Sequence, residues 1–126
     1  MSIEATIQTR LASQVALVAD ANIRTPGDWQ DLDLPYISHF RVSGGGSVHV
    51  HGAAVNQRDH DFYQISVFAS SWANADAIEK QIITALDGYR AAGVPLVRFL
   101  GTFPNYEDET KIHHFAMNFR IVENLT

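Results

Sequence analysis

The sequence predicts an α+β domain in which two helices pack on a single mixed, largely antiparallel sheet, in the order α-β-(β)-β-α-β-β. Three patterns carry this prediction. Residues 62–69 are dense in aromatic and β-branched side chains, which are typical of a half-buried strand. They lead directly into an apolar stripe at helical spacing. Residues 112–122 alternate apolar and polar side chains, as expected of an antiparallel strand with one packed face.

The first helix is expected over residues 3–18. Ser2 is suited to cap it, and Glu4 lies in the first turn, where the helix dipole favours a carboxylate. The apolar positions recur at spacings of 4, 4, 4 and 3 residues, which is one face of an amphipathic helix: Ile3, Ile7, Leu11, Val15 and Val18. This face is expected to pack on the same core as the second helix.

The second helix is expected over residues 73–90, with Ser70 and Ser71 as possible caps. Its apolar stripe consists of Ala75, Ile78, Ile82, Ala85, Leu86 and Tyr89. The opposite face carries Asp76, Glu79, Lys80 and Asp87, so only one side is suited to burial. Gly93-Val94-Pro95 ends the helical pattern.

Residues 19–34 show no periodicity and contain Pro26-Gly27-Asp28, which is turn chemistry in an extended connection. Trp29 has two interpretations. Its ring covers an edge of the core, or it is an aromatic anchor in a subunit interface, where Trp is enriched.

A first strand is expected to open at Leu34-Pro35-Tyr36 and to end at the glycine run 44–46, which is interpreted as a flexible turn. Val48, His49, Val50 and His51 alternate and predict a short strand. Residues 52–61 are polar and rich in turn formers, so residues 43–61 are expected to form a long hairpin or loop. Such loops are common places for partner contacts.

The last third of the chain predicts two further strands. The first covers residues 96–100 and is followed by an acidic turn over 104–109, which includes Tyr106 and Glu107. In the final strand, one face is expected to carry His113, Phe115, Met117, Phe119 and Ile121. The other face is expected to carry His114, Ala116, Asn118 and Arg120.

Length and composition bound the class of protein. The 126 residues predict one domain over residues 1–126, and 46% hydrophobic with 18% charged residues is a globular composition. The formal net charge is −5, from 9 Lys and Arg against 14 Asp and Glu, and the basic residues are scattered singly. DNA binding as the main role is therefore disfavoured. No apolar run approaches the roughly 20 residues needed to span a bilayer, and the N-terminus lacks the pattern of a signal peptide. The chain is therefore expected to be cytosolic where it is made.

No motif in the sequence predicts catalysis. The absence of Cys excludes a thiol nucleophile, and there is no Gly-x-Ser-x-Gly nucleophile elbow. His49, His51 and His60 suggest a metal site, but no Cys or helical His pair supports it, and the adjacent His113 and His114 would point to opposite faces of a strand. We expect no catalytic residues, no cofactor and no metal.

The order of the features resembles one family. Arg24-Thr25-Pro26 follows the first helix, Leu34-Pro35-Tyr36-Ile37 opens a strand, and Gln64-Ile65-Ser66-Val67-Phe68-Ala69 leads into a helix that ends at Asp87-Gly88. The chain closes on His114-Phe115-Ala116-Met117-Asn118-Phe119-Arg120-Ile121. Over residues 3–123 this resembles the tail completion, or tail terminator, proteins of long-tailed phages and prophage-like particles.

The resemblance implies a structural virion protein without catalytic residues. Family members form a six-subunit ring that caps the tail tube, ends tube polymerisation and joins the tail to the head-side connector. Expected partners are other copies of the chain, the tail tube protein and the connector or stopper protein, with DNA passing through the lumen unbound. The expected location is the tail or neck of the virion, assembled in the cytoplasm of a bacterial host.

A ring built from heterologous contacts needs two different contact faces on each subunit. Candidate interface residues are Trp29, Val48, His49, Val50, His51, Tyr106, Glu107, His114, Asn118 and Arg120. Two alternatives remain open at this stage. One is a head-completion or neck protein of the same particle, and the other is a small α+β ligand-binding or enzymatic dimer with histidines and Tyr63 lining a pocket.

Overall fold

The computed structural model describes residues 3–25, 34–42, 46–49 and 56–124, with the backbone alone along 46–49 and 56–61. Its elements are the helices α1 (Ile3–Gln14) and α2 (Trp72–Leu86), the short 3₁₀ helix η1 (Asp20–Asn22), and the strands β1 (Ile23–Arg24), β2 (Tyr36–Arg41), β3 (Gly46–His49), β4 (Asn56–Ala69), β5 (Leu96–Glu107) and β6 (Ile112–Asn124).

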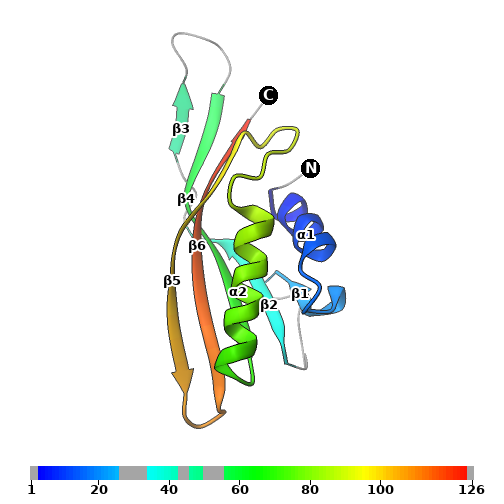
Figure 1. Ribbon diagram of the computed structural model, residues 1–126. Coiled ribbons are helices and arrows are strands. Elements are labelled where there is room, and N and C mark those ends of the chain that lie inside the picture. Colours follow the sequence, from blue (N-terminus) through cyan, green and yellow to red (C-terminus); the bar gives the residue numbers. More distant parts are fainter. Residues whose placement is uncertain (1–2, 26–33, 43–45, 50–55, 125–126) are drawn as a thin grey trace.

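The described strands form one sheet in the order β1-β2-β4-β6-β5, with β3 paired to the outer half of β4 (Figure 1). Among the described strands, the β1–β2 pair alone is parallel, and the other pairs are antiparallel. The prediction of a mixed, largely antiparallel sheet is confirmed. The parallel strand β1 was not predicted, because two residues are too short to carry a periodicity.

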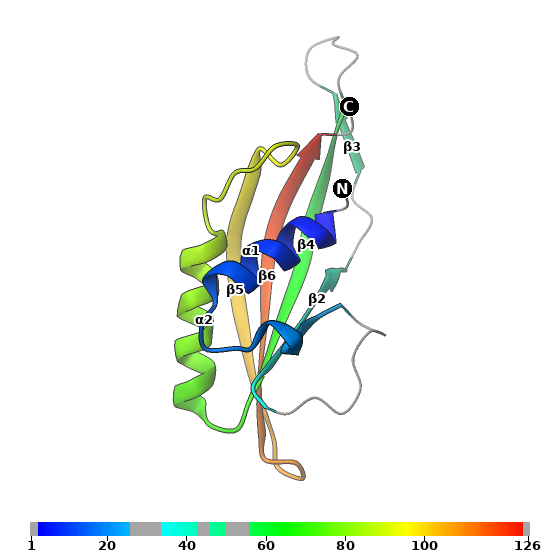
Figure 2. The same ribbon diagram turned by 90° about the vertical axis from the view of Figure 1, so that its right-hand side faces the viewer.

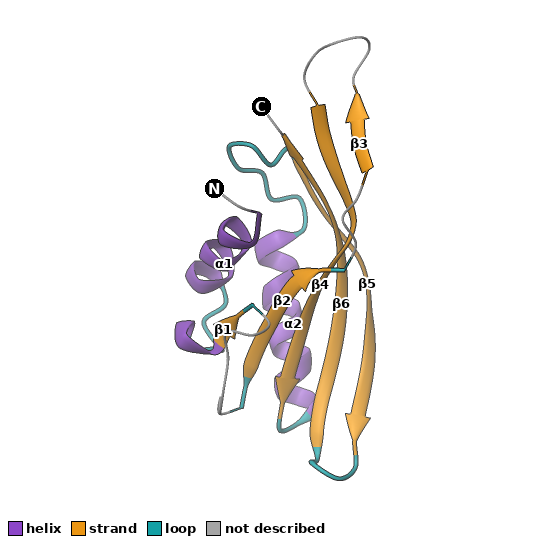
Figure 3. Ribbon diagram, turned by 180° about the vertical axis from the view of Figure 1, so that it is seen from behind, coloured by secondary structure: helices purple, strands orange, loops and turns teal. Residues whose placement is uncertain are grey.

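Both helices lie on the same face of the sheet (Figures 2 and 3). Between this helical layer and the sheet lies one apolar core, to which α1 contributes Ile3, Ile7 and Leu11 and α2 contributes Ile78 and Ile82. From the sheet, the core receives Ile23, Ile37, Tyr63, Ile65, Val67, Val97, Phe115, Met117, Phe119 and Ile121. The predicted inward face of the final strand is therefore confirmed from Phe115 to Ile121, while His113 is only half-buried.

The first helix ends earlier than predicted. α1 stops at Gln14, yet Val15 and Val18 remain buried in the core. The backbone N–H of Leu17 donates to Gln81 Oε1 on α2 at 3.2 Å. The N–H of Leu17 is therefore bonded to a side chain of α2 and not to the backbone of α1. The apolar spacing continues beyond the helix because residues 15–18 still pack on the core.

Two strands are longer than predicted. β4 begins at Asn56, inside the segment interpreted as loop, because residues 57–59 pair with β6 on one side and residues 56–59 pair with β3 on the other. β5 continues to Glu107, so the predicted turn over 104–109 was wrong, and the turn covers residues 108–111. Pro104 is tolerated because β5 is an edge strand, where a missing N–H need not break a ladder.

The start and end of α2 follow local chemistry. Ser71 is extended, and its hydroxyl accepts a hydrogen bond from the N–H of Asn74 at 3.2 Å, which confirms one of the two predicted caps. The helix ends at Leu86, before the predicted end at residue 90. Gly88 has φ of +78°, a conformation that glycine adopts without strain.

One buried polar chain ties α1 to the sheet. Gln8 Nε2 donates to the carbonyl of Ile23 at 2.7 Å, which leaves Gln8 Oε1 as an acceptor. His39 Nε2 lies 2.7 Å from that oxygen, and His39 Nδ1 lies 2.7 Å from the hydroxyl of Tyr63. His39 therefore carries its proton on Nε2, and the Tyr63 hydroxyl donates to Nδ1.

This chain is satisfied only when His39 is neutral. Burial lowers the pKa of His39 to about 4, and the nearby Glu4 carboxylate opposes that effect in part. Burial likewise raises the pKa of Tyr63, so its hydroxyl stays protonated. A protonated His39 would carry a proton on Nδ1 as well, so the Tyr63 hydroxyl would lose the acceptor for its own proton.

Acid is therefore expected to destabilise the fold through His39. In the unfolded chain His39 is protonated below its ordinary pKa of 6.5, whereas in the folded chain it is protonated only below a pKa of about 4. Stability present at neutral pH is thus lost as the pH falls through this interval, by about 3 kcal/mol at ~1.4 kcal/mol for each pH unit. Urea unfolding at several pH values measures the slope, and His39→Gln is expected to flatten it. An equally steep slope in the variant would assign the acid sensitivity to other groups.

Loss of the helix cap gives a second stability prediction. Ser71→Ala removes the acceptor for the Asn74 N–H and is expected to cost about 1 kcal/mol of unfolding free energy. Thermal or urea unfolding measures it against Ser70→Ala, which leaves the Ser71 cap in place. Equal effects of the two substitutions would show that the cap contributes nothing specific.

Candidate functional site

The face of the sheet opposite the helices has no covering layer among the described residues (Figure 3). We call it the uncovered face. Strict alternation with the core residues of β6 places Ala116, Asn118 and Arg120 on it, together with His114. All four are half-buried by their neighbours within the sheet. The predicted outward face of the final strand is therefore confirmed, whereas its role in an interface stays a prediction.

Three aromatic rings cross this face in a continuous stack. Tyr36 on β2 lies 4.6 Å from Phe68 on β4, and Phe68 lies 4.4 Å from His114 on β6, measured between ring centroids. The interplanar angles of 21° and 11° make both contacts stacked ones. Cross-strand aromatic pairs of this kind stabilise neighbouring strands.

The stack favours uncharged rings. Burial lowers the pKa of His114, with Glu107 acting in the opposite direction. Burial also raises the pKa of Tyr36, and Glu107 adds to that effect. His114 Nε2 is buried and has no hydrogen-bond partner among the described residues. The surroundings of the stack thus favour the neutral forms of both His114 and Tyr36.

Large apolar side chains are exposed along the same face. Phe103 on β5 pairs with Ala116 and is 68% exposed, and Phe62 stands beside the core residue Tyr63 on the opposite side of β4. Val42 continues the edge at the end of β2 and is also exposed. Exposed apolar residues gathered on one face mark interaction surfaces more often than single scattered ones.

A bulge in β5 is what brings Phe103 to this face. Val97 and Phe99 pair with core residues of β6, and uninterrupted alternation would put residue 103 on the core side too. The register shifts at Leu100, so Thr102 takes the core side and Phe103 faces outward. The sequence did not predict the outward orientation of Phe103, because the local pattern of residues gives no sign of the bulge.

A second aromatic cluster lies on the helical side, where the β5–β6 hairpin ends. Trp72, at the start of α2, makes edge contacts with Phe115 at 4.8 Å and His113 at 6.2 Å. Tyr106 lies 4.6 Å from His113 on its other flank. Both Trp72 and Tyr106 remain about half exposed. Tyr106 and Glu107 were predicted as residues of a turn and lie instead at the end of β5, while Trp72 was not predicted.

The other predicted interface residues are not brought together in the part of the chain that the structure describes. Trp29, Val50 and His51 lie outside the described residues. Val48 and His49 lie in β3, opposite Gln57 and Asn56, where only the backbone is described. The predicted short strand is confirmed at Val48 and His49, whereas the predicted turn was wrong at Gly46, where β3 begins. The contacts of these side chains stay a prediction.

A metal centre finds no support among the described side chains, where no three His, Asp or Glu residues cluster closely enough to hold an ion. His113 and His114 face opposite sides of the sheet, as their adjacency predicted: one contacts Trp72 and the other Phe68. Within the described ranges, no helix has the length and apolar character needed to span a membrane.

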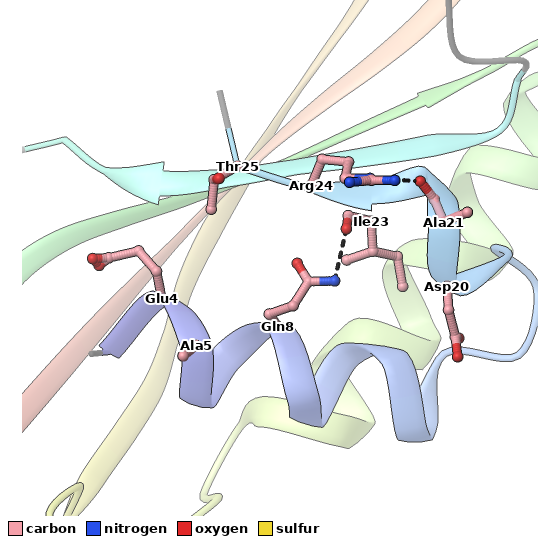
Figure 4. A pocket seen from close by; sticks show the side chains of 8 residues that line it. All are labelled: Glu4, Ala5, Gln8, Asp20, Ala21, Ile23, Arg24 and Thr25. Atoms are coloured by element: carbon pink, nitrogen blue, oxygen red, sulfur yellow. Dashed lines mark hydrogen bonds between the residues drawn. The ribbon is translucent and has the colours of Figure 1, made fainter. Parts of the chain in front are cut away.

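The groove between α1 and the segment 20–25 has a volume of about 520 Å³ (Figure 4). Three of its polar side chains are engaged within the protein, and Asp20 and Thr25 also line it. Gln8 bonds to Ile23 and His39, Arg24 Nε donates to the carbonyl of Ala21, and Glu4 holds Arg41 in an ion pair at 2.6 Å. These contacts make the groove a structural junction between α1, η1 and β1.

Comparison with known proteins finds a likeness of fold. No protein-family model matches the sequence, and no curated protein matches it. Among solved structures, the chain is similar to a chain of the virion of a native gene transfer agent (GTA) particle. The TM-score is 0.74 at 18% sequence identity, over 98% of this chain and 95% of that one. At this identity the likeness shows that the two chains share a fold across nearly their whole lengths.

Proposed function

We propose that the protein is a structural component of a phage-like virion, and that it forms a ring which caps the tail tube, ends tube polymerisation and joins the tail to the head-side connector. The observation that carries the proposal is the shared fold with a chain of the gene transfer agent virion, over almost all of both chains. The resemblance of the sequence to tail terminators supports the more specific role of a ring that caps the tail tube.

The surface of the subunit supports a role in assembly. The uncovered face combines an aromatic stack with exposed apolar side chains such as Phe103 and Phe62. The buried centres of protein interfaces are depleted in charge and enriched in aromatic residues, and the row Tyr36, Phe68 and His114 fits this description. In the groove beside α1, by contrast, Gln8, Arg24 and Glu4 bond within the protein.

The charge of the chain suits the proposed lumen. A net charge of −5 disfavours adhesion of DNA, whose phosphates bind best to basic surfaces. DNA can then pass through a ring of such subunits without being held. A clearly basic lumen in an assembled ring would contradict this part of the proposal.

The ring itself is the first test. Negative-stain imaging and light scattering of the protein, alone and mixed with tail tubes of the same particle, are expected to show rings or capped tube ends. Phe103→Asp on the uncovered face is expected to weaken capping of tube ends roughly 30-fold or more, since losing a buried aromatic anchor typically costs ~2 kcal/mol. Circular dichroism checks that the variant folds.

Leu17→Asp is the matched control, because Leu17 is an exposed apolar residue outside the sheet, 49% exposed. It is expected to leave the capping of tube ends intact. A compact dimer that neither forms rings nor binds tube ends would overturn the proposed function. Capping of an isolated head rather than a tube would instead favour a head-completion or neck protein.

A further inference from the structure

One end of the molecule presents an aromatic projection. Trp72 is 54% exposed and Tyr106 is 46% exposed, although both pack against His113. His113 Nδ1 is buried beside them, with no hydrogen-bond partner among the described residues. Tryptophan and tyrosine are the residues that most often anchor protein interfaces.

The same end is acidic. Glu107, Asp108 and Glu109 are exposed in the β5–β6 hairpin, and Lys111 is the cation of the same turn. Three carboxylates against one ammonium leave a local charge of −2. The aromatic projection is therefore flanked by negative charge, and a surface that receives it should be concave, apolar and basic at its rim.

A hollow lies on the same side of the sheet, at the other end of α2. It has a volume of about 510 Å³ and lies between α1, the loop after α2 and the end of β6. Its apolar lining consists of Ile3, Tyr89, Ala91, Ala92 and Val94, and its polar lining of Thr6, Thr9, Glu123 and Asn124. Its size falls in the range of pockets that hold a ring-sized group.

The hollow is held in shape by backbone bonds. Ala91 and Val94 exchange two hydrogen bonds, at 3.1 and 2.9 Å, and the N–H of Asn124 donates to the carbonyl of Gly93 at 2.7 Å. Gly93 has φ of +80°, which lets the loop turn tightly at that point. A preformed hollow reduces the ordering cost of binding.

Two arginines lie next to residues that line the hollow. Arg10 lies over the ring of Tyr89, 4.3 Å from its centroid, and Arg90 is exposed next to it in the chain. Glu123 also lines the hollow, where its carboxylate acts electrostatically on Arg41. The two guanidinium groups can therefore face the carboxylates of the β5–β6 turn.

We propose that these two ends are the halves of one contact between copies of this chain: Trp72 of one copy seats in the hollow beside Tyr89 of the next, and the acidic turn faces Arg90. The occupant is a second copy because shape and charge are complementary on the two ends of the same molecule. Different patches meet, so the contact is heterologous and builds a ring where the rotation closes.

This contact gives the ring of the proposed function a specific interface, but it does not depend on a virion role. It is also separate from the uncovered face, which lies on the opposite side of the sheet. A subunit would then have one heterologous contact through its ends and a further surface free for another neighbour.

Disulfide trapping tests the contact. The chain has no Cys, so Glu109→Cys combined with Arg90→Cys introduces the only thiols. α2, with 15 residues, spans about 22 Å between the two ends, whereas a disulfide needs Cα atoms within about 7 Å. A bond between the two positions must therefore join different copies. Oxidation of the concentrated double variant is expected to give a ladder beyond the dimer or one closed covalent ring.

Each single-Cys variant is the control, because one thiol per chain yields dimers at most. A double variant that also stops at dimers would overturn the proposal. As a second test, Arg90→Glu is expected to reduce the non-covalent oligomer at least tenfold and Glu109→Arg to restore it in the double variant. Rings that persist in Arg90→Glu without a disulfide ladder would reject this contact and leave the proposed function standing.

Discussion

The pairing of β4 with β6 is the constraint on which the rest of the molecule depends. It runs from Gln57 opposite Asn124 to Ala69 opposite His113, with one register shift between His60 and Tyr63. Because side chains alternate along both strands, this register decides at once which residues enter the core and which form the uncovered face. Phe115, Met117 and Phe119 fall under the helices, and the ring of His114 is then placed to stack on Phe68.

The two helices are held on one side of this sheet by different kinds of interaction. α2 is attached mainly by apolar burial, through residues such as Ile78 and Ile82. α1 adds the hydrogen-bonded chain through Gln8, His39 and Tyr63, and the ion pair of Glu4 with Arg41. An exposed ion pair is worth little, so the buried chain supplies most of the polar specificity with which α1 is positioned.

Periodicity predicted the architecture well, and local composition predicted boundaries poorly. The alternation in β6 and the stripe of α2 are properties of single segments, so they can be read without knowing the neighbours. The start of β4 depends instead on pairing with β3 and β6, and its polar residues look like loop when taken alone. The outward turn of Phe103 depends on the register shift at Leu100, which exists only as a relation between β5 and β6. His114, Asn118 and Arg120 could thus be assigned to a face, whereas Trp72 and Phe103 could not be recognised as exposed.

The bulge at Leu100 and the proline at 104 also bear on how the chain stays in solution before it assembles. β5 forms an edge of the sheet over twelve residues, and an open edge is a template for adding strands from other chains without limit. These two interruptions leave residues 96–99 and 101–103 as the regular stretches before the strand end, each shorter than the 5–6 residues of a typical strand. The edge is thereby protected against fibrillar growth, so that association can be left to surfaces formed by side chains.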